Sequence, residues 1–226
     1  MNNNRIEHEI LEKCNPKKES YVSLCFDAIT QLSENRYLIT NTESDNEVIL
    51  ERNYILAMVF LMGKKTKDDE SFGTNVFPSG ENNKYICDNL NDIKETYNNL
   101  HSKELKGKFK VIPDLVIHTS HNPKSQYSKS QYVALEAKTT KQLGKVAFYR
   151  DLFKLNVYLC DLSYKDVVYL IVNTEKKKIE DLISQYFSNN YFYNKDKLNN
   201  IWFFIQENGE SSPYAYKLCE NYIKSL

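Results

Sequence analysis

KVIPDLVIHTSHNPKSQYSKSQYVALEAKTT, residues 110–140, is the stretch that decides the fold. It holds two short apolar runs that both carry acid: Asp114 follows a proline in the first run, and Glu136 and Lys138 close the second. Residues two apart in a strand point to the same face of a sheet. If the two runs pair as a hairpin, the side chains of Asp114, Glu136 and Lys138 can meet on one face. Two carboxylates and a lysine in one place are costly to bury without a metal ion or a charged ligand.

Length and composition predict a single domain over 1–226. The 226 residues are 41% hydrophobic, which suffices for a sizeable core. No run of 18 apolar residues occurs, so no membrane span is expected, and the first ten residues lack the apolar segment of a signal peptide. The cysteines are odd in number, scattered and free of any CxxC pair, which favours reduced thiols in a cytoplasmic protein over disulfides or a zinc site. They are Cys14, Cys25, Cys87, Cys160 and Cys219.

Charge is distributed unevenly along a chain whose net charge is zero. Residues 103–154, which include the stretch 110–140, carry 11 basic and 4 acidic groups, a net charge of +7. Residues 1–100 carry 11 basic and 17 acidic groups. A positive field beside clustered carboxylates suits a polyanionic substrate. The alternative is a lysine-rich solvated surface.

The pattern of elements predicts an α/β (α+β) fold, with a mixed central β-sheet flanked by helices. DVVYLIVN (166–173) is a continuous apolar run, typical of a buried central strand. Three parts are expected around it: an N-terminal helical extension over 1–40 with helices at 3–14 and 20–33, a core over 47–173, and a helix–strand–helix over 174–226 that completes the sheet. Residues 64–83 are expected to form a polar loop, and the last 15 residues a closing helix.

The acidic and basic residues of the stretch 110–140 suit phosphodiester hydrolysis. That reaction needs charge neutralised on the phosphate and an activated water. Mg²⁺ prefers carboxylate and carbonyl oxygens. Asp114 and Glu136 offer two carboxylates, and the backbone carbonyl of Ala137 offers a third oxygen. Lys138 can orient or deprotonate the attacking water, or hold charge on the phosphate. The predicted cofactor is therefore Mg²⁺ or Mn²⁺.

The chain resembles the PD-(D/E)xK nuclease superfamily, which has the restriction-endonuclease-like fold. The matching residues are Pro113-Asp114 and Glu136-Ala137-Lys138, each in a β-type run. The resemblance implies a metal-dependent nuclease with an αβββαβ core. That core would comprise a helix at 47–63, strands at 84–88, 110–118 and 131–138, a helix at 143–160 and a strand at 166–173.

The stretch also looks like a group of small bacterial nuclease-like proteins of unassigned role. The further residues that carry this likeness are Cys87-Asp88, PDLVIH (113–118) and Asp151-Leu-Phe-Lys154-Leu155. An ExK pattern alone is not specific, because Glu104/Lys106 and Glu175/Lys177 also satisfy it. The alternative is a plain hairpin, with Asp114 in a proline turn and Glu136 and Lys138 as a surface pair.

In the superfamily, an acid on the first core helix often completes the metal shell, and the resemblance implies Glu47 or Glu51 for that role. The two lie four residues apart on one helical face. Glu47 is favoured by its place at the helix start and Glu51 is the alternative. Glu47 also fits a capping box with Ser44, which is its structural explanation.

Nucleic-acid contacts are expected from basic residues around the two strands. Lys154 and Arg150 would face the substrate backbone, and the alternative for both is a surface role with the charged end in water. His118 and His121 follow the first strand; a loop histidine near phosphate is favoured over a general base, because Lys138 already fills that position. Lys141 lies just after the second strand.

The sequence thus predicts a Mg²⁺-dependent nuclease whose partner is nucleic acid, with DNA the expected substrate and RNA left open. No membrane contact is expected. A homodimer is left open, because cutting both strands of a duplex needs two sites. The alternative function is a non-catalytic nucleic-acid-binding protein, or an accessory protein of a defence or mobile-element system, that keeps the nuclease fold.

Overall fold

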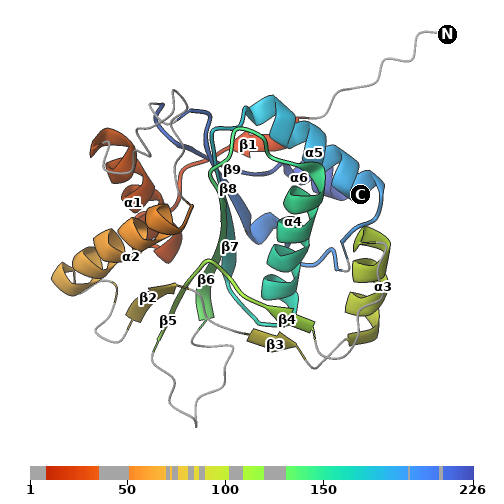
Figure 1. Cartoon of the computed structure of the whole chain (residues 1–226), viewed down its shortest axis with the longest axis horizontal. Helices are drawn as coiled ribbons and strands as arrows, with labels where there is room; N and C mark the ends of the chain where they lie inside the picture. The colour runs from red at the N-terminus through yellow and green to blue at the C-terminus, as the bar shows by residue number, and fades with distance from the viewer. Residues whose placement is uncertain are drawn as a thin grey trace, which may run out of the picture.

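The chain folds around a seven-stranded mixed sheet with helices on both faces, which confirms the expected α/β class. The structure is a computed structural model (Figure 1). It describes residues 9–35, 51–69, 72, 76–80, 84–86, 90–101, 109–119, 131–192, 194–208 and 211–226.

The strand order in the main sheet is β1-β9-β8-β7-β6-β5-β2. The three central strands β6, β7 and β8 run parallel, and every other neighbouring pair is antiparallel. The strands are β1 (Leu11–Lys13), β2 (Val76–Gly80), β5 (Leu115–Thr119), β6 (Gln131–Lys138), β7 (Asp166–Val172), β8 (Ile201–Gln206) and β9 (Tyr214–Leu218).

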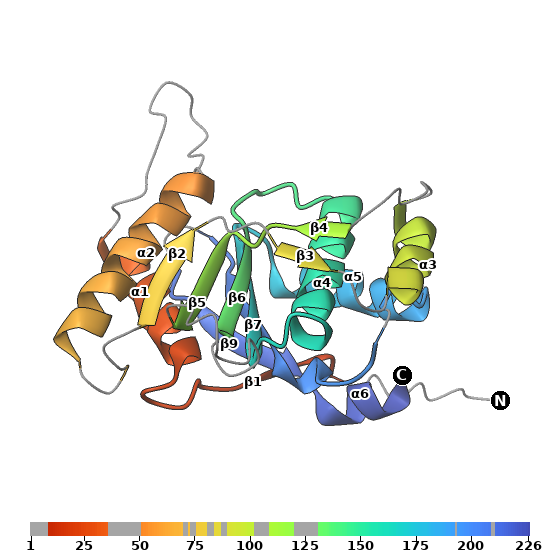
Figure 2. The same ribbon diagram turned by 90° about the horizontal axis from the view of Figure 1, so that it is seen from below.

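Central strands are apolar along their whole length because helices cover both faces. Every residue of β8 is buried, as are six of the seven in β7. On one face lie α1 (Tyr21–Asn35) and α2 (Glu51–Asp68), and on the other α4 (Lys145–Cys160) and α5 (Lys176–Ser188) (Figures 1 and 2). In the described part of the chain, no helix has the length and apolar content to cross a bilayer.

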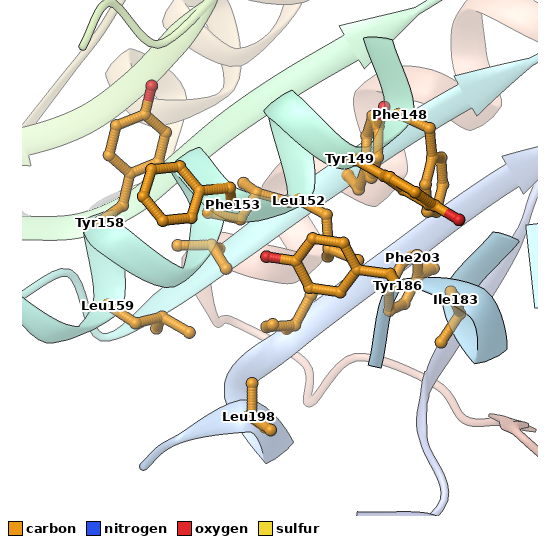
Figure 3. Packing of buried hydrophobic residues seen from close by; sticks show 14 of the residues in the cluster. Phe148, Tyr149, Leu152, Phe153, Tyr158, Leu159, Ile183, Tyr186, Leu198 and Phe203 are labelled. Atoms are coloured by element: carbon orange, nitrogen blue, oxygen red, sulfur yellow. The ribbon is translucent and has the colours of Figure 1, made fainter. Parts of the chain in front are cut away.

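Helix α4 provides most of the apolar surface that covers its face of the sheet. Phe148 stacks on Tyr169 of β7, and Tyr149 packs against Tyr186 of α5; Figure 3 shows Phe148, Tyr149 and Tyr186 within this cluster. Tyr158 lies at one end of this cluster, with its hydroxyl pointing away from it. The aliphatic and aromatic side chains therefore fix α4 rigidly against β6 and β7, which determines where its polar residues point.

The expected first core strand at 84–88 is wrong as a strand of the main sheet. Strand β3 (Lys84–Ile86) pairs with β4 (Phe109–Val111) in a separate two-stranded sheet. The strand that pairs with β5 at this edge of the main sheet is β2, which lies within residues 64–83, the stretch that was expected to be a polar loop. Strand β2 contains Pro78 and ends at Gly80. An edge strand tolerates proline because one side of it has no ladder hydrogen bonds to make, so this strand carries loop-like residues.

The expected strand at 110–118 is interrupted in the middle. Strand β4 ends at Val111 and β5 begins at Leu115, so Pro113 and Asp114 lie between two strands that belong to different sheets. Proline has no N–H for a ladder, which explains the break. Between β3 and β4 the chain forms the helix α3 (Leu90–His101).

Both ends of the chain contain strands where helices were expected. Leu11–Lys13 forms β1, so the helix expected over 3–14 is wrong there, and the N-terminal part is not purely helical. The expected closing helix is wrong over Tyr214–Leu218, which forms β9; only α6 (Glu220–Ser225) is helical. These two strands pair with each other, a contact between distant parts of the chain that no local pattern reveals.

Candidate functional site

Asp114 and Glu136 lie side by side because β5 begins where β6 ends. The two strands are antiparallel, with Leu115 opposite Leu135. The backbone N–H of Asp114 donates to the Leu135 carbonyl at 3.0 Å. Asp114 Oδ2 accepts a hydrogen bond from the Ala137 N–H at 2.7 Å. The proline break therefore fixes one carboxylate oxygen and leaves Oδ1 as the oxygen for a ligand.

Glu136 points into the layer between β6 and α4 and is 1% exposed. Its Oε1 accepts a hydrogen bond from the Tyr158 hydroxyl at 2.5 Å. Its Oε2 forms an ion pair with Lys154 Nζ. Both partners come from α4, so the buried carboxylate is satisfied by one helix.

Lys138 joins the two helical layers at the end of β6. Its Nζ lies 2.6 Å from the Ala137 carbonyl oxygen and donates to Glu51 Oε1 and Oε2 at 3.3 and 3.2 Å. Glu51 is the first residue of α2, so it reaches the site from the opposite face of the sheet. Lys138 Nζ also lies 3.3 Å from Asp151 Oδ2 on α4.

Asp151 is the acid that the sequence reasoning did not assign to the site. It is 0% exposed, and its carboxylate lies 3.3 Å from Lys138 Nζ and 3.2 Å from Lys154 Nζ. These contacts are ion pairs without hydrogen-bond geometry. Tyr158 was missed as well. A signal was available, because Asp151, Lys154 and Tyr158 are spaced three and four residues apart and so share one helical face.

Burial changes the acidity of the carboxyl groups in this cluster. It raises the pKa of Glu136 to about 8, against the opposing effect of Lys154. Burial also raises the pKa of Asp114, opposed by the hydrogen bond from Ala137, and that of Glu51, opposed by Lys138. Glu136 therefore holds a proton more readily than an exposed glutamate.

The two lysines hold their protons more firmly than usual. Burial lowers the pKa of Lys138, but Asp151 and Glu51 outweigh it and the net shift is upward. For Lys154 the pKa is likewise raised, because Glu136 and Asp151 outweigh burial. Both side chains therefore remain cations at neutral pH, facing the acids.

A pocket of about 310 Å³ opens beside Asp114. It lies between the start of α2 and the end of β2. Its lining residues are Glu51, Arg52, Ile55, Leu56, Gly80 and Asp114. Two of the candidate acids therefore face a space that a small part of a substrate can enter.

The donor set suits a hard divalent cation in chemistry, but two ammonium groups would have to move first. Asp114, Glu136 and the Ala137 carbonyl provide oxygens of the type that Mg²⁺ prefers. Ammonium groups now lie against them, with Lys154 on Glu136 and Lys138 on the Ala137 carbonyl. Across the described residues, no three His, Cys, Asp or Glu side chains are grouped as a metal site. A metal ion at these oxygens requires Lys154 Nζ, which already lies 3.2 Å from Asp151, to leave Glu136, and Lys138 Nζ to leave the Ala137 carbonyl.

The residues expected to contact nucleic acid are spread apart. Lys154 faces inward to Glu136 and Asp151, so it is not a free surface cation. The Arg150 side chain is 52% exposed, with Nε 3.5 Å from Asp151 Oδ1. His118 lies four residues beyond Asp114, about 13 Å along β5, with Nδ1 2.8 Å from the Thr119 carbonyl oxygen.

Lys141 is exposed and lines a different pocket, of about 390 Å³, with residues that follow β7 and β8. The structure thus brings together Asp114, Glu136, Lys138 and the alternative acid Glu51. Lys154, which was expected to contact nucleic acid, is instead a member of this cluster. The favoured fourth metal ligand, Glu47, lies outside the described residues, as do His121, Cys87 and Asp88.

Comparisons of the chain with models of protein families, with curated proteins and with solved structures find no match. The resemblance to the PD-(D/E)xK nucleases therefore stays a prediction from the sequence motifs.

Proposed function

We propose that this protein is a Mg²⁺- or Mn²⁺-dependent nuclease that hydrolyses phosphodiester bonds in DNA. The observation that carries the proposal is the meeting of Asp114, Glu136, Lys138 and the Ala137 carbonyl at one strand end, next to a pocket lined by Asp114 and Glu51. Two carboxylates, a carbonyl oxygen and a lysine suit a phosphate with a divalent cation.

Each of these residues has a distinct proposed role. Asp114, Glu136 and the Ala137 carbonyl would hold the ion, with Glu51 as an additional acid. When bound, Mg²⁺ neutralises charge on the phosphate and makes a water molecule more acidic. The Lys138 ammonium would bind a phosphate oxygen or orient the attacking water. Lys154 would move to Asp151, which lies 3.2 Å from its Nζ, and so free Glu136.

A second candidate is a nucleic-acid-binding or accessory protein that keeps this fold without turnover. One observation favours it: Glu136 is already satisfied by Lys154 and Tyr158, and Glu51 by Lys138. A cluster that is paired internally does not need a metal ion to offset its burial. An accessory protein of a defence or mobile-element system that becomes active with a partner belongs to the same candidate.

Cleavage assays distinguish the two functions. Plasmid, linear duplex and single-stranded DNA are incubated with Mg²⁺, Mn²⁺ or EDTA and with three proteins: wild type, Asp114→Ala, and Glu220→Ala as a control at an exposed acid on α6. We expect metal-dependent cleavage by wild type and the control, and a loss of at least about 100-fold in Asp114→Ala. Equal activity in Asp114→Ala would rule out the proposed site. Absence of cleavage together with no heat of Mn²⁺ binding would favour the second candidate.

A cytoplasmic location and a homodimer are also proposed. The location is supported by the free thiols of Cys14, Cys25, Cys160 and Cys219.

The dimer would supply the second site that cutting both strands of a duplex requires. Light scattering of the purified protein tests it.

A further inference from the structure

The outward face of α2 combines apolar and basic side chains in a way that the core does not explain. Leu56 is 56% exposed and Phe60 is 73% exposed, although both are large apolar residues. Arg52 lies one turn before Leu56, Lys64 lies one turn after Phe60, and all four are exposed. Residues four apart share a helical face and are about 6 Å apart along the axis. We call these residues, with the exposed Lys67, the α2 stripe.

The α2 stripe begins at the candidate active site. Arg52 and Leu56 line the same pocket of about 310 Å³ as Asp114 and Glu51. Glu51 in turn binds Lys138 Nζ at 3.2 Å. A strand whose phosphate reached Lys138 could therefore continue through this pocket and along α2 without leaving the surface.

The charge of α2 matches a polyanion. Over Glu51–Asp68 the helix contains four basic residues, and its two acidic residues, Glu51 and Asp68, lie at its ends, so its net charge is +2. Lys65 is paired with Asp27, whereas Arg52, Lys64 and Lys67 border the two exposed apolar side chains. Cations that track a backbone, beside an aromatic ring on which a base can stack, are the combination that binds single strands.

We propose that the α2 stripe binds the single-stranded segment of nucleic acid next to the phosphate that is cleaved, with a base stacked on Phe60. This inference rests on the proposed nuclease function and specifies its substrate. A duplex keeps its base faces stacked inside, so it would leave Leu56 and Phe60 against sugar and water. A second copy of the chain fits less well, because a stable dimer buries about 800 Å² on each partner, more than two side chains offer.

Binding is measured with full-length protein and a fluorescein-labelled 12-nucleotide DNA, single-stranded or as a duplex. Fluorescence anisotropy in EDTA, and again in Ca²⁺, reports binding separately from cleavage. We expect Phe60→Ala to weaken single-strand binding roughly 5- to 100-fold, and Phe60→Trp to retain it with quenching of the new tryptophan. Lys64→Ala should lower the slope of log affinity against log salt by roughly 0.7. Circular dichroism verifies that each variant is folded.

The matched control is Tyr214→Ala, which removes another exposed aromatic residue from β9, on the far side of the sheet. Equal effects of Phe60→Ala and Tyr214→Ala would overturn the inference. So would duplex binding that is as tight and as dependent on Phe60, a Phe60-dependent dimer without DNA, or no binding in either buffer. Phe60-dependent binding without any cleavage would support the α2 stripe as a single-strand binding surface and would contradict the proposed nuclease activity.

Discussion

Glu136 is the residue on which the site depends most, because it is buried and its two oxygens have different partners. Tyr158 donates to Oε1 and Lys154 pairs with Oε2. If the carboxylate holds a metal ion, Lys154 must leave, whereas Tyr158 can stay and orient it. Groups that orient a ligating side chain in this way typically contribute 10- to 100-fold to metal affinity.

Tyr158→Phe should therefore weaken Mn²⁺ binding by about 10- to 100-fold while the protein remains folded. Isothermal titration calorimetry measures the affinity. Tyr186→Phe is the matched control, since its buried hydroxyl has no hydrogen-bond partner among the residues that the structure describes and should be dispensable. Unchanged affinity in Tyr158→Phe would show that the hydroxyl has no part in positioning Glu136.

The pKa of Glu136 predicts how stability depends on pH in the metal-free protein. Burial raises this pKa from its ordinary value of 4.5 to about 8, so the folded chain holds a proton that the unfolded chain has released. Stability should therefore fall as pH rises from about 4.5 to about 8. Urea unfolding in EDTA at several pH values measures it. Glu136→Gln should flatten this dependence, and an equally steep fall in that variant would contradict the assignment.

At the scale of elements, α4 connects the apolar core to the polar site. One side of it packs on β7 and α5, and the spacing of Asp151, Lys154 and Tyr158 directs the other side to the end of β6. The break between β4 and β5 has a comparable role, since it places Asp114 beside Ala137. The site thus depends on one rigid helix and one interrupted strand.

Asp151→Asn tests the role of α4 in stability. The substitution preserves volume but leaves Lys138 and Lys154 with less negative charge near them. We expect a loss of about 3 kcal/mol, the low end for a broken buried ion pair, because those lysine side chains are 15% and 17% exposed. Urea unfolding at pH 7 measures the change. Arg150→Ala on the same helix is the control, with an expected change below about 1 kcal/mol. A similar loss of unfolding free energy in both variants would show that Asp151 does not stabilise the cluster through its ion pairs with Lys138 and Lys154.

For the whole molecule, the sequence predicted the centre of the sheet and failed at its edges. Strands β6, β7 and β8 and the helices between them follow from continuous apolar runs and helical periodicity, which are local signals. Strands β1 and β2 are short and pair with strands far away in the chain, so propensity alone could not identify them. Strand β9 pairs with β8, its neighbour in the chain, and with the distant β1; its residues were expected to be part of the closing helix.

The site was predictable to a similar extent. Asp114, Glu136 and Lys138 follow from the two-residue period of strands and from the strand pairing. Asp151 was missed although its spacing from Lys154 and Tyr158 was a signal, because an acid on a helix is expected to face water and its burial depends on two lysines from different elements. Glu51 was the alternative choice, and the described residues bring it to Lys138 together with Asp151.

We propose that Asp114, Glu136 and the Ala137 carbonyl hold a metal ion, and a crystal structure of the protein soaked in Mn²⁺ is the decisive test. We expect anomalous density between Asp114, Glu136 and the Ala137 carbonyl oxygen, with Lys154 Nζ moved away from Glu136 and still paired with Asp151. A well-ordered site without Mn²⁺ density, in which Lys154 still pairs with Glu136, would contradict it.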